Sequence, residues 1–185
     1  MNIKTERLIL RQWRDEDYPH YAKLNADPEV MKYFPTTLDE DESNQQANII
    51  SELISERGWG FWAVELKATG QFIGFVGLHH QDQASGIPFT PFIEVGWRLA
   101  SEFWGKGYAT EAAKKALEFA FEHLSAPCVY AFTASLNKPS QRVMSKINML
   151  NTDADFNHPK LTRGHILERH CLYSITKNQW MKVAG

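Results

Sequence analysis

A glycine-rich turn is the feature of this sequence whose residue types and spacing most clearly suggest binding chemistry. Gly105 and Gly107 stand two residues apart, directly before the most regular helical pattern in the chain. Such glycines let the backbone approach a ligand closely, and a helix start offers free N–H groups and the positive end of the helix dipole. The turn therefore predicts a site for an anionic group such as a phosphate, although glycines alone would indicate only a turn.

Two common nucleotide-binding motifs do not fit this turn. A Walker phosphate loop requires G-x-x-x-x-G-K-[ST], which is absent. A dinucleotide fingerprint requires G-x-G-x-x-G near the first strand, and residues 105–110 supply only half of it. We therefore expect an anion cradle made mainly of backbone N–H groups.

Glu94 is the first candidate for a general base. It lies in a strand predicted over residues 92–99, and a carboxylate in a partly desolvated cleft can accept a proton directly or through water. The alternative is a strand glutamate that faces solvent or pairs with Arg98, and the residues do not choose between the two. Glu102 and Glu111 flank the turn and are weaker candidates, since an acidic residue in a first helical turn simply favours the dipole.

The elements that must position these residues follow from hydrophobic periodicity and from turn residues. Strands are expected near residues 8–13 and over 61–66, 72–79, 92–99, 128–134 and 167–175, and helices after Asp15 and over 28–31, 36–57, 108–124 and 140–147. The stretches 81–91 and 153–164 lack periodicity and are expected to be loops. This order predicts an α/β fold with one mixed, mostly antiparallel twisted sheet and helices on both faces.

Composition limits the classes of protein. With 185 residues and 43% hydrophobic content, we expect a single domain over residues 1–185. A formal charge of −2 argues against nucleic acid as a partner, and no apolar run approaches the roughly 18 residues that cross a bilayer, so a cytoplasmic protein is expected. Cys128 and Cys171 are expected to be free thiols, and neither the cysteines nor the histidines have metal-ligand spacing.

The wider sequence resembles the Gcn5-related N-acetyltransferase (GNAT) family over residues 5 to about 150. The run F-W-G-K-G-Y-A-T-E-A at 103–112 matches the family's pyrophosphate loop at Gly107 and Ala109, and it is similar to the RimJ/RimL-like branch. Further matches are T-E-R-L-I-L-R at 5–11, E-V-G-W-R-L at 94–99 and N-K-P-S-Q-R-V at 137–143. The resemblance implies a splayed central strand pair and acetyl-CoA as co-substrate. It also implies an amine acceptor, either a small molecule or a protein N-terminus, and a monomer or homodimer without metal.

The resemblance also implies particular site residues. The backbone of Val95, Trp97 and Leu99 would bind the pantetheine arm, and Asn137 and Ser140 would lie near the cofactor. The pyrophosphate would lie on the turn formed by Trp104, Gly105, Lys106, Gly107, Tyr108, Ala109 and Thr110. The proton for the leaving thiolate would come from Ser140; Tyr173, on the last predicted strand, and water are the other candidate donors.

Three positions depart from the family pattern. Trp104 replaces the usual Gln or Arg of the loop, so binding should depend on the backbone. Asn148 replaces a common Gly, and Asn tolerates the same left-handed conformation. Met144 occupies the place where many relatives have a general-acid tyrosine, so a non-catalytic acyl-CoA-binding module is the alternative function.

The acceptor remains open at this stage. The loop around His158 and His165 resembles a segment of one bacterial subgroup, and we expect it to border the acceptor site, although histidines usually have structural or surface roles. The acidic run 39–42 could attract basic protein tails, but such runs usually form a solvated helix face. A purely structural domain would bind no acetyl-CoA at all.

Overall fold

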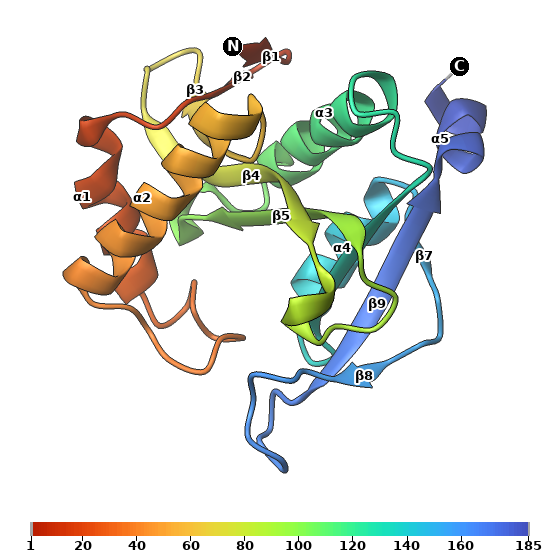
Figure 1. Cartoon of the computed structure of the whole chain (residues 1–185). Helices are drawn as coiled ribbons and strands as arrows, with labels where there is room; N and C mark the ends of the chain where they lie inside the picture. The colour runs from red at the N-terminus through yellow and green to blue at the C-terminus, as the bar shows by residue number, and fades with distance from the viewer. Residues whose placement is uncertain (1, 185) are drawn as a thin grey trace. The chain divides into compact units, whose positions relative to one another are not determined.

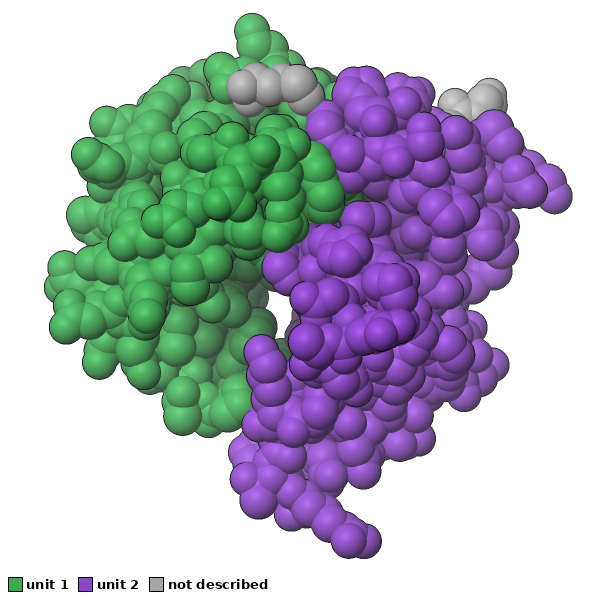
Figure 2. Space-filling model, in the orientation of Figure 1, with its two compact units in different colours: residues 1–78, 96–116 green, residues 79–95, 117–185 purple. Residues whose placement is uncertain are grey.

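The computed structural model describes residues 2–184 and contains two compact units (Figure 2). Unit 1 comprises the described residues up to Leu78 together with Gly96–Ala116. Unit 2 comprises His79–Val95 and the described residues from Leu117 onward. The chain passes between the units within three elements, β4, β5 and α3, so the units are not successive segments of sequence. The expectation of a single domain over residues 1–185 stays a prediction.

Unit 1 contains an antiparallel set of strands with two helices. The strands are β1 (Ile3–Lys4), β2 (Leu8–Arg11), β3 (Phe61–Leu66) and the first part of β4 (Phe72–Gln81). The helices α1 (Tyr18–Ala26) and α2 (Glu40–Arg57) lie side by side (Figure 1). They bury Tyr21, Leu24, Ala47, Ile50 and Ile54, so their apolar faces form a core.

Helix α2 ends where its sequence predicts but begins later than expected. Asp39 Oδ1 accepts from the Glu42 N–H at 2.9 Å, and Glu42 Oε2 accepts from the Asp39 N–H at 2.9 Å. This reciprocal capping box fixes the first turn at Glu40, so the expected start at residue 36 is wrong. Gly58 ends the helix at φ +78°, as its type predicts.

Unit 2 is built around the pairing of three strands. Strand β6 (Cys128–Ala134) pairs antiparallel with β9 (Arg169–Thr176) along its whole length and parallel with β5 (Phe92–Leu99) through Ile93↔Val129 and Glu94↔Tyr130. The short strands β7 (Leu150–Asn151) and β8 (Phe156–Asn157) pair with β9. Helices α4 (Lys138–Lys146) and α5 (Lys177–Ala184) belong to this unit. The mixed, mostly antiparallel sheet confirms the predicted fold class.

Helix α3 (Tyr108–Glu122) begins at the glycine-rich turn and is preceded by a 3-10 turn, η3 (Ser101–Phe103). Its small and apolar residues recur every three or four positions and are almost inaccessible to solvent: Ala112, Ala113, Ala116, Leu117, Ala120 and Phe121. The buried stripe agrees with the predicted periodicity, and the helix ends two residues before the expected Leu124.

The predicted helix over residues 28–31 is wrong. These residues form hydrogen-bonded turns, in which the Met31 N–H bonds to the Asp27 carbonyl at 3.0 Å. Asp27 Oδ1 accepts from the Glu29 N–H at 2.9 Å, so the local side-chain bond expected of a cap is present. A four-residue segment cannot offset the cost of helix nucleation, and it stops after one turn.

Helix α5 was not predicted, although its start carries a recognisable signal. Thr176 Oγ1 accepts from the Gln179 N–H at 3.2 Å, and Gln179 Oε1 accepts from the Thr176 N–H at 2.8 Å. The sequence T-K-N-Q at 176–179 is therefore a capping box. Among residues 2–184, no helix has the length and apolar character needed to cross a membrane.

Candidate functional site

The glycine-rich turn in unit 1 has the backbone conformation of an anion cradle. Gly105 and Gly107 have φ values of +73° and +81°, in the left-handed region that favours glycine. The Glu111 N–H bonds to the Gly107 carbonyl at 3.0 Å, so the helical hydrogen-bond pattern begins there. The N–H groups of Tyr108, Ala109 and Thr110 precede it and have no helical acceptor. The turn thus presents free donors at the positive end of a 15-residue helix.

A network from the N-terminal segment braces this turn. Arg7 Nε and Glu111 Oε2 form an ion pair at 2.6 Å, and Arg7 Nη1 donates to the Lys106 carbonyl at 2.9 Å. Thr5 Oγ1 donates to Glu111 Oε1 at 2.6 Å, and the Arg7 guanidinium lies 4.6 Å from the centre of the Tyr108 ring. Partial burial would raise the pKa of Glu111, but the hydrogen bonds from Thr5 and Arg7 lower it. Glu111 is therefore a structural carboxylate within the turn.

Trp104 connects the turn to the end of β5. Its indole Nε1 donates to the Leu99 carbonyl at 2.9 Å, while the ring is 46% exposed. Along β5, Val95 and Leu99 are buried and Trp97 is partly exposed. The carbonyl of Leu99 is therefore already engaged by Trp104.

In unit 2, Glu94 is held by one strong hydrogen bond in a largely desolvated position. Gln81 Nε2, at the end of β4, donates to Glu94 Oε2 at 2.7 Å. Burial raises the pKa of Glu94 to about 7, and the Gln81 hydrogen bond offsets only part of this effect. Glu94 thus pairs with Gln81 rather than with Arg98, whose hydrogen bonds go to other residues. A carboxyl group with this pKa exchanges protons near neutral pH.

Strand register places Glu94 and Tyr173, the two candidate proton-transfer residues that lie on strands of unit 2, on opposite faces of its sheet. Glu94 pairs with Tyr130, and Tyr130 pairs with Ser174, so these three side chains share one face. Tyr173 is the next residue along β9 and pairs with Ala131, so it points to the other face. Burial raises the pKa of Tyr173, which is 9% exposed.

The N-terminus of α4 uses Asn137 as its cap. Asn137 Oδ1 accepts from the Ser140 N–H at 3.2 Å, and Asn137 Nδ2 donates to Thr133 Oγ1 at 2.9 Å. The Ser140 hydroxyl has no hydrogen-bond partner within residues 2–184, and the residue is partly exposed. Met144 is 2% exposed in the same helix. Asn137 is therefore engaged as a cap, whereas the Ser140 hydroxyl is free.

A cluster of aromatic and imidazole rings lies on the Glu94 face of unit 2. Phe132 follows Tyr130 by two residues on β6 and shares its face, and its ring lies 5.9 Å from Phe156 and 6.1 Å from His158. The rings of His158 and His170 are 4.8 Å apart. Burial and the neighbouring His170 lower the pKa of His158 to about 4, and burial lowers that of His170. Both imidazoles are therefore neutral at pH 7.

Comparison with known proteins identifies the family. A family model described as "Acetyltransferase (GNAT) domain" matches residues 7–150. The chain belongs to this family. It is an acetyltransferase, and the sequence resemblance drawn from the glycine-rich turn is confirmed.

Similar proteins cover nearly the whole acetyltransferase chain. The "FsC-acetyl coenzyme A-N(2)-transacetylase" of Aspergillus fumigatus is 31% identical over 98% of this chain and 78% of its own. The crystal structure of a GNAT-family acetyltransferase from Bacillus anthracis is 26% identical, covers 96% of this chain and 99% of its own, and has a TM-score of 0.79. An acetyltransferase structure from Agrobacterium tumefaciens str. C58 is also 26% identical, covers 95% and 94% of the two chains, and has a TM-score of 0.75.

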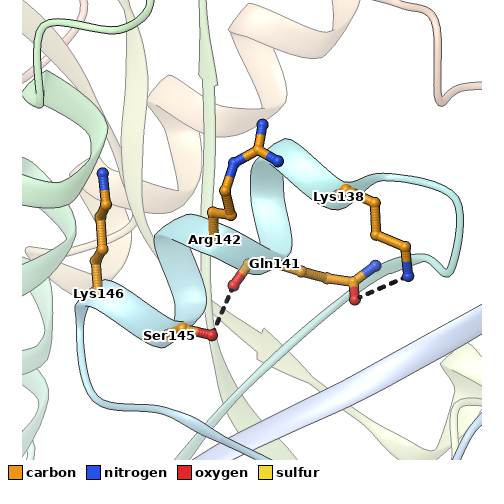
Figure 3. Close-up of a pocket in the computed structure, with 5 residues that line it drawn as sticks. All are labelled: Lys138, Gln141, Arg142, Ser145 and Lys146. Carbon is orange, nitrogen blue, oxygen red and sulfur yellow. Dashed lines mark hydrogen bonds between the residues drawn. The ribbon is translucent and has the colours of Figure 1, made fainter.

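A basic hollow of about 510 Å³ lies beside α4 of this acetyltransferase (Figure 3). Its lining comes from Lys138, Gln141, Arg142, Ser145 and Lys146. The three cations are spaced four residues apart on one helix, and all three are exposed. None of the candidate site residues lines this hollow.

Sequence reasoning missed two supporting residues of the acetyltransferase. Gln81, the partner of Glu94, lies in the segment expected to be a loop, where no motif marks it. Arg7 lies in residues 5–11, which resemble the family, but nothing in the sequence connects it with its ion-pair partner Glu111. Within residues 2–184, no group of three or more His, Cys, Asp or Glu side chains could hold a metal ion.

Proposed function

We propose that this acetyltransferase transfers an acetyl group from acetyl-CoA to a primary amine by direct attack of the amine on the thioester, with Glu94 as general base. The observation that carries the proposal is the Glu94 carboxyl group, whose pKa of about 7 lies where a base for an amine works best. Gln81 orients this carboxylate through a 2.7 Å hydrogen bond. Membership of the RimJ/RimL-like branch within the family is part of the same proposal.

The glycine-rich turn fits the pyrophosphate of acetyl-CoA. An added Cβ at Gly105 would meet nothing within 4 Å, so the turn is open on that side. Backbone N–H groups from Gly105 to Thr110 would hold the phosphates, and Trp104 and Lys106 belong to the same turn. Val95, Trp97 and Leu99 would hold the pantetheine arm through their backbone, and Asn137 would add a contact from α4.

Acetyl-CoA supplies an activated thioester when it is bound. Glu94 would accept the proton of the attacking amine at its carboxylate, directly or through a water molecule. Ser140 is the favoured donor of a proton to the leaving thiolate, because its hydroxyl is free of other hydrogen bonds. Tyr173 is the second candidate; it is 9% exposed and lies on the sheet face opposite Glu94.

The ring cluster of Phe132, Phe156, His158 and His170 supports an acceptor site on the Glu94 face of unit 2. Aromatic faces attract ammonium groups, and neutral imidazoles add no repulsion to an incoming amine. The loop with His158 and His165 would therefore border the acceptor. The name of the fungal relative specifies transfer to an N(2) position of its own acceptor.

An acceptor screen tests this proposal. Purified protein is incubated with acetyl-CoA and a panel of amino acids, polyamines, arylalkylamines and N-terminal peptides, and CoA release and acetylated product are both measured. We expect turnover of at least one amine, and a loss of about 100-fold or more in Glu94→Gln. Equal turnover by wild type and Glu94→Gln at every pH would remove Glu94 from the mechanism.

A further inference from the structure

Helix α4 carries a strongly basic surface in a chain that is slightly acidic overall. Residues 123–152 contain no Asp or Glu, although the whole chain has 22 acidic residues and a formal charge of −2. The Lys and Arg residues of this stretch are Lys138, Arg142 and Lys146, and all three lie on α4. The helix therefore carries three positive charges with no carboxylate in the adjoining sequence.

The three cations occupy one face of α4, because they follow one another at four-residue intervals. Successive members are therefore about 6 Å apart along the helix axis. Like charges at this spacing repel and destabilise a helix. Lys138 is also the first residue of α4, where a cation opposes the helix dipole. An anion bound against this face would offset both effects.

Two of the three cations have no partner in the part of the chain that the structure describes. Neither Arg142 nor Lys146 forms a hydrogen bond or an ion pair with residues 2–184. Both side chains are exposed and extend from α4 in the same direction (Figure 3). Lys138 instead reaches Gln141, whose Oε1 accepts from its Nζ at 3.5 Å. Arg142 and Lys146 thus keep all their donors for a ligand.

The hollow beside these side chains has the size of a small-molecule site. Its volume of about 510 Å³ falls within the range of about 300–1,000 Å³ that is typical of ligand sites. Of the two neutral residues in its lining, Ser145 donates through Oγ to the Gln141 carbonyl at 3.1 Å. Gln141 Nε2 donates to the Ser135 carbonyl at 3.0 Å. The neutral residues are therefore engaged with the protein, and the free donors of the lining belong to the cations.

We propose that this hollow binds a phosphate group, which Arg142 and Lys146 contact directly. The Arg142 guanidinium can donate two parallel hydrogen bonds to phosphate oxygens, and Lys146 adds an ammonium group about one helical turn away. A phosphate dianion matches the charge of these two unpaired cations, and Lys138 raises the positive potential of the same face. Every residue of this site lies in unit 2. Binding here goes beyond the proposed acetyl transfer and requires neither Glu94 nor turnover.

The phosphate group can belong to acetyl-CoA itself, as its 3′-phosphate, or to a separate small molecule. Calorimetric titration with acetyl-CoA and with acetyl-3′-dephospho-CoA tests the first source, because the two differ by the 3′-phosphate alone. If this phosphate occupies the hollow, the wild type should bind acetyl-CoA about tenfold more tightly than the dephospho form. Arg142→Gln and Lys146→Gln should each reduce this ratio to less than about threefold.

Titration of inorganic phosphate into protein saturated with acetyl-CoA tests the second source, with phosphorus NMR at constant ionic strength as the measurement. If a separate molecule fills the hollow, the two cofactor forms should bind equally well and phosphate should bind to the acetyl-CoA complex. Arg142→Gln and Lys146→Gln should then each weaken phosphate binding about tenfold.

Two further variants separate a phosphate site from a general effect of charge. Arg142→Lys keeps the charge but loses the two-donor edge, so most of the effect of Arg142→Gln should remain. Lys182→Gln is the control, because it removes an exposed cation from α5 of the same unit. It should change neither the cofactor ratio nor phosphate binding.

The proposal is overturned if neither the cofactor ratio nor phosphate binding differs between the wild type and the two α4 glutamine variants. An equal change in Lys182→Gln would overturn it as well, since α4 would then be only a solvated basic face. Both titrations are made without an amine acceptor, so their outcome is independent of the acceptor screen that tests acetyl transfer and the role of Glu94.

Discussion

The side-chain amide of Gln81 donates a 2.7 Å hydrogen bond to Oε2 of Glu94 across neighbouring strands of unit 2. This bond favours the carboxylate form, while burial favours the protonated form and prevails. Burial and the Gln81 hydrogen bond together therefore place the pKa of the Glu94 carboxyl group at about 7.

The rate should depend on pH through Glu94. A general base must be deprotonated, so the rise of kcat/KM with pH should show an inflection near pH 7. Gln81→Leu removes the bond that favours the carboxylate, and the inflection should move to higher pH. The amine's own ionisation is separated by repeating the profile with an acceptor of different amine pKa, since only the amine-dependent limb should move.

The Glu94 carboxylate should also lower the free energy of unfolding above neutral pH. Its pKa is about 7 in the folded chain and about 4.5 when exposed, so the folded state binds the proton more tightly. Stability from this group is greatest at low pH and falls as pH rises from about 4.5 to 7. Glu94→Gln should therefore raise the free energy of unfolding at pH 8, by at most about 3 kcal/mol. Denaturant unfolding at pH 5 and pH 8 measures this difference, and an equal effect at both pH values would contradict it.

Acetyl-CoA binding should depend on the backbone of the glycine-rich turn. Gly107→Val should abolish binding, because its φ of +81° is strained for valine. Trp104→Ala loses one side-chain hydrogen bond and should weaken binding less than about tenfold. Calorimetric titration with acetyl-CoA measures both effects.

Two glycines with similar backbone conformations distinguish a role of the turn in acetyl-CoA binding from the effect of backbone strain. Gly105 and Gly70 have φ values of +73° and +71°, and an added Cβ meets nothing within 4 Å at either. Gly105→Ala should weaken acetyl-CoA binding, whereas Gly70→Ala, in the turn between β3 and β4, should destabilise the chain to a similar extent without affecting the Kd. Equal Kd values for the two variants would argue against the turn as the binding element.

Arg7 should support the turn without taking part in chemistry. Arg7→Met breaks the ion pair with Glu111 and the bond to the Lys106 carbonyl, so the turn loses its brace. We expect the KM for acetyl-CoA to rise about threefold to tenfold with kcat changed less than about twofold. A fall in kcat at unchanged KM would point to a different role.

The histidine-containing loop should affect the acceptor alone. His158→Ala removes a ring that lies 6.1 Å from Phe132 and 4.8 Å from His170. We expect a several-fold rise in acceptor KM for His158→Ala and for His165→Ala, with the KM for acetyl-CoA unchanged. His20→Ala, at an exposed position on α1, is the control. Unchanged acceptor kinetics in both loop variants would show that the loop does not border the acceptor.

Local signals predicted much of the fold because they act within a few residues. The strands 92–99 and 128–134 agree with the structure to the residue. Asn148 has φ +63°, the left-handed conformation expected where relatives have glycine. Gly58 likewise ends α2, because a left-handed C-cap is a property of the residue type.

Pairings between distant segments could not be predicted in the same way. Arg7 and Glu111 are 104 residues apart in sequence, and only the assembled unit 1 brings them together. The position of Tyr173 on the face opposite Glu94 depends on strand register, which a one-residue shift would reverse. Arg98 donates hydrogen bonds to three residues of α1 and α2, none of which lies in a recognisable motif.

We propose that Glu94 accepts the proton of an amine that attacks acetyl-CoA. The most direct test is CoA release by wild type and Glu94→Gln with one active acceptor, measured from pH 5.5 to about pH 9. We predict a wild-type profile with an inflection near pH 7 and a variant that is at least about 100-fold slower and lacks this inflection. A variant that retains the wild-type rate and the same inflection would show that Glu94 is not the general base.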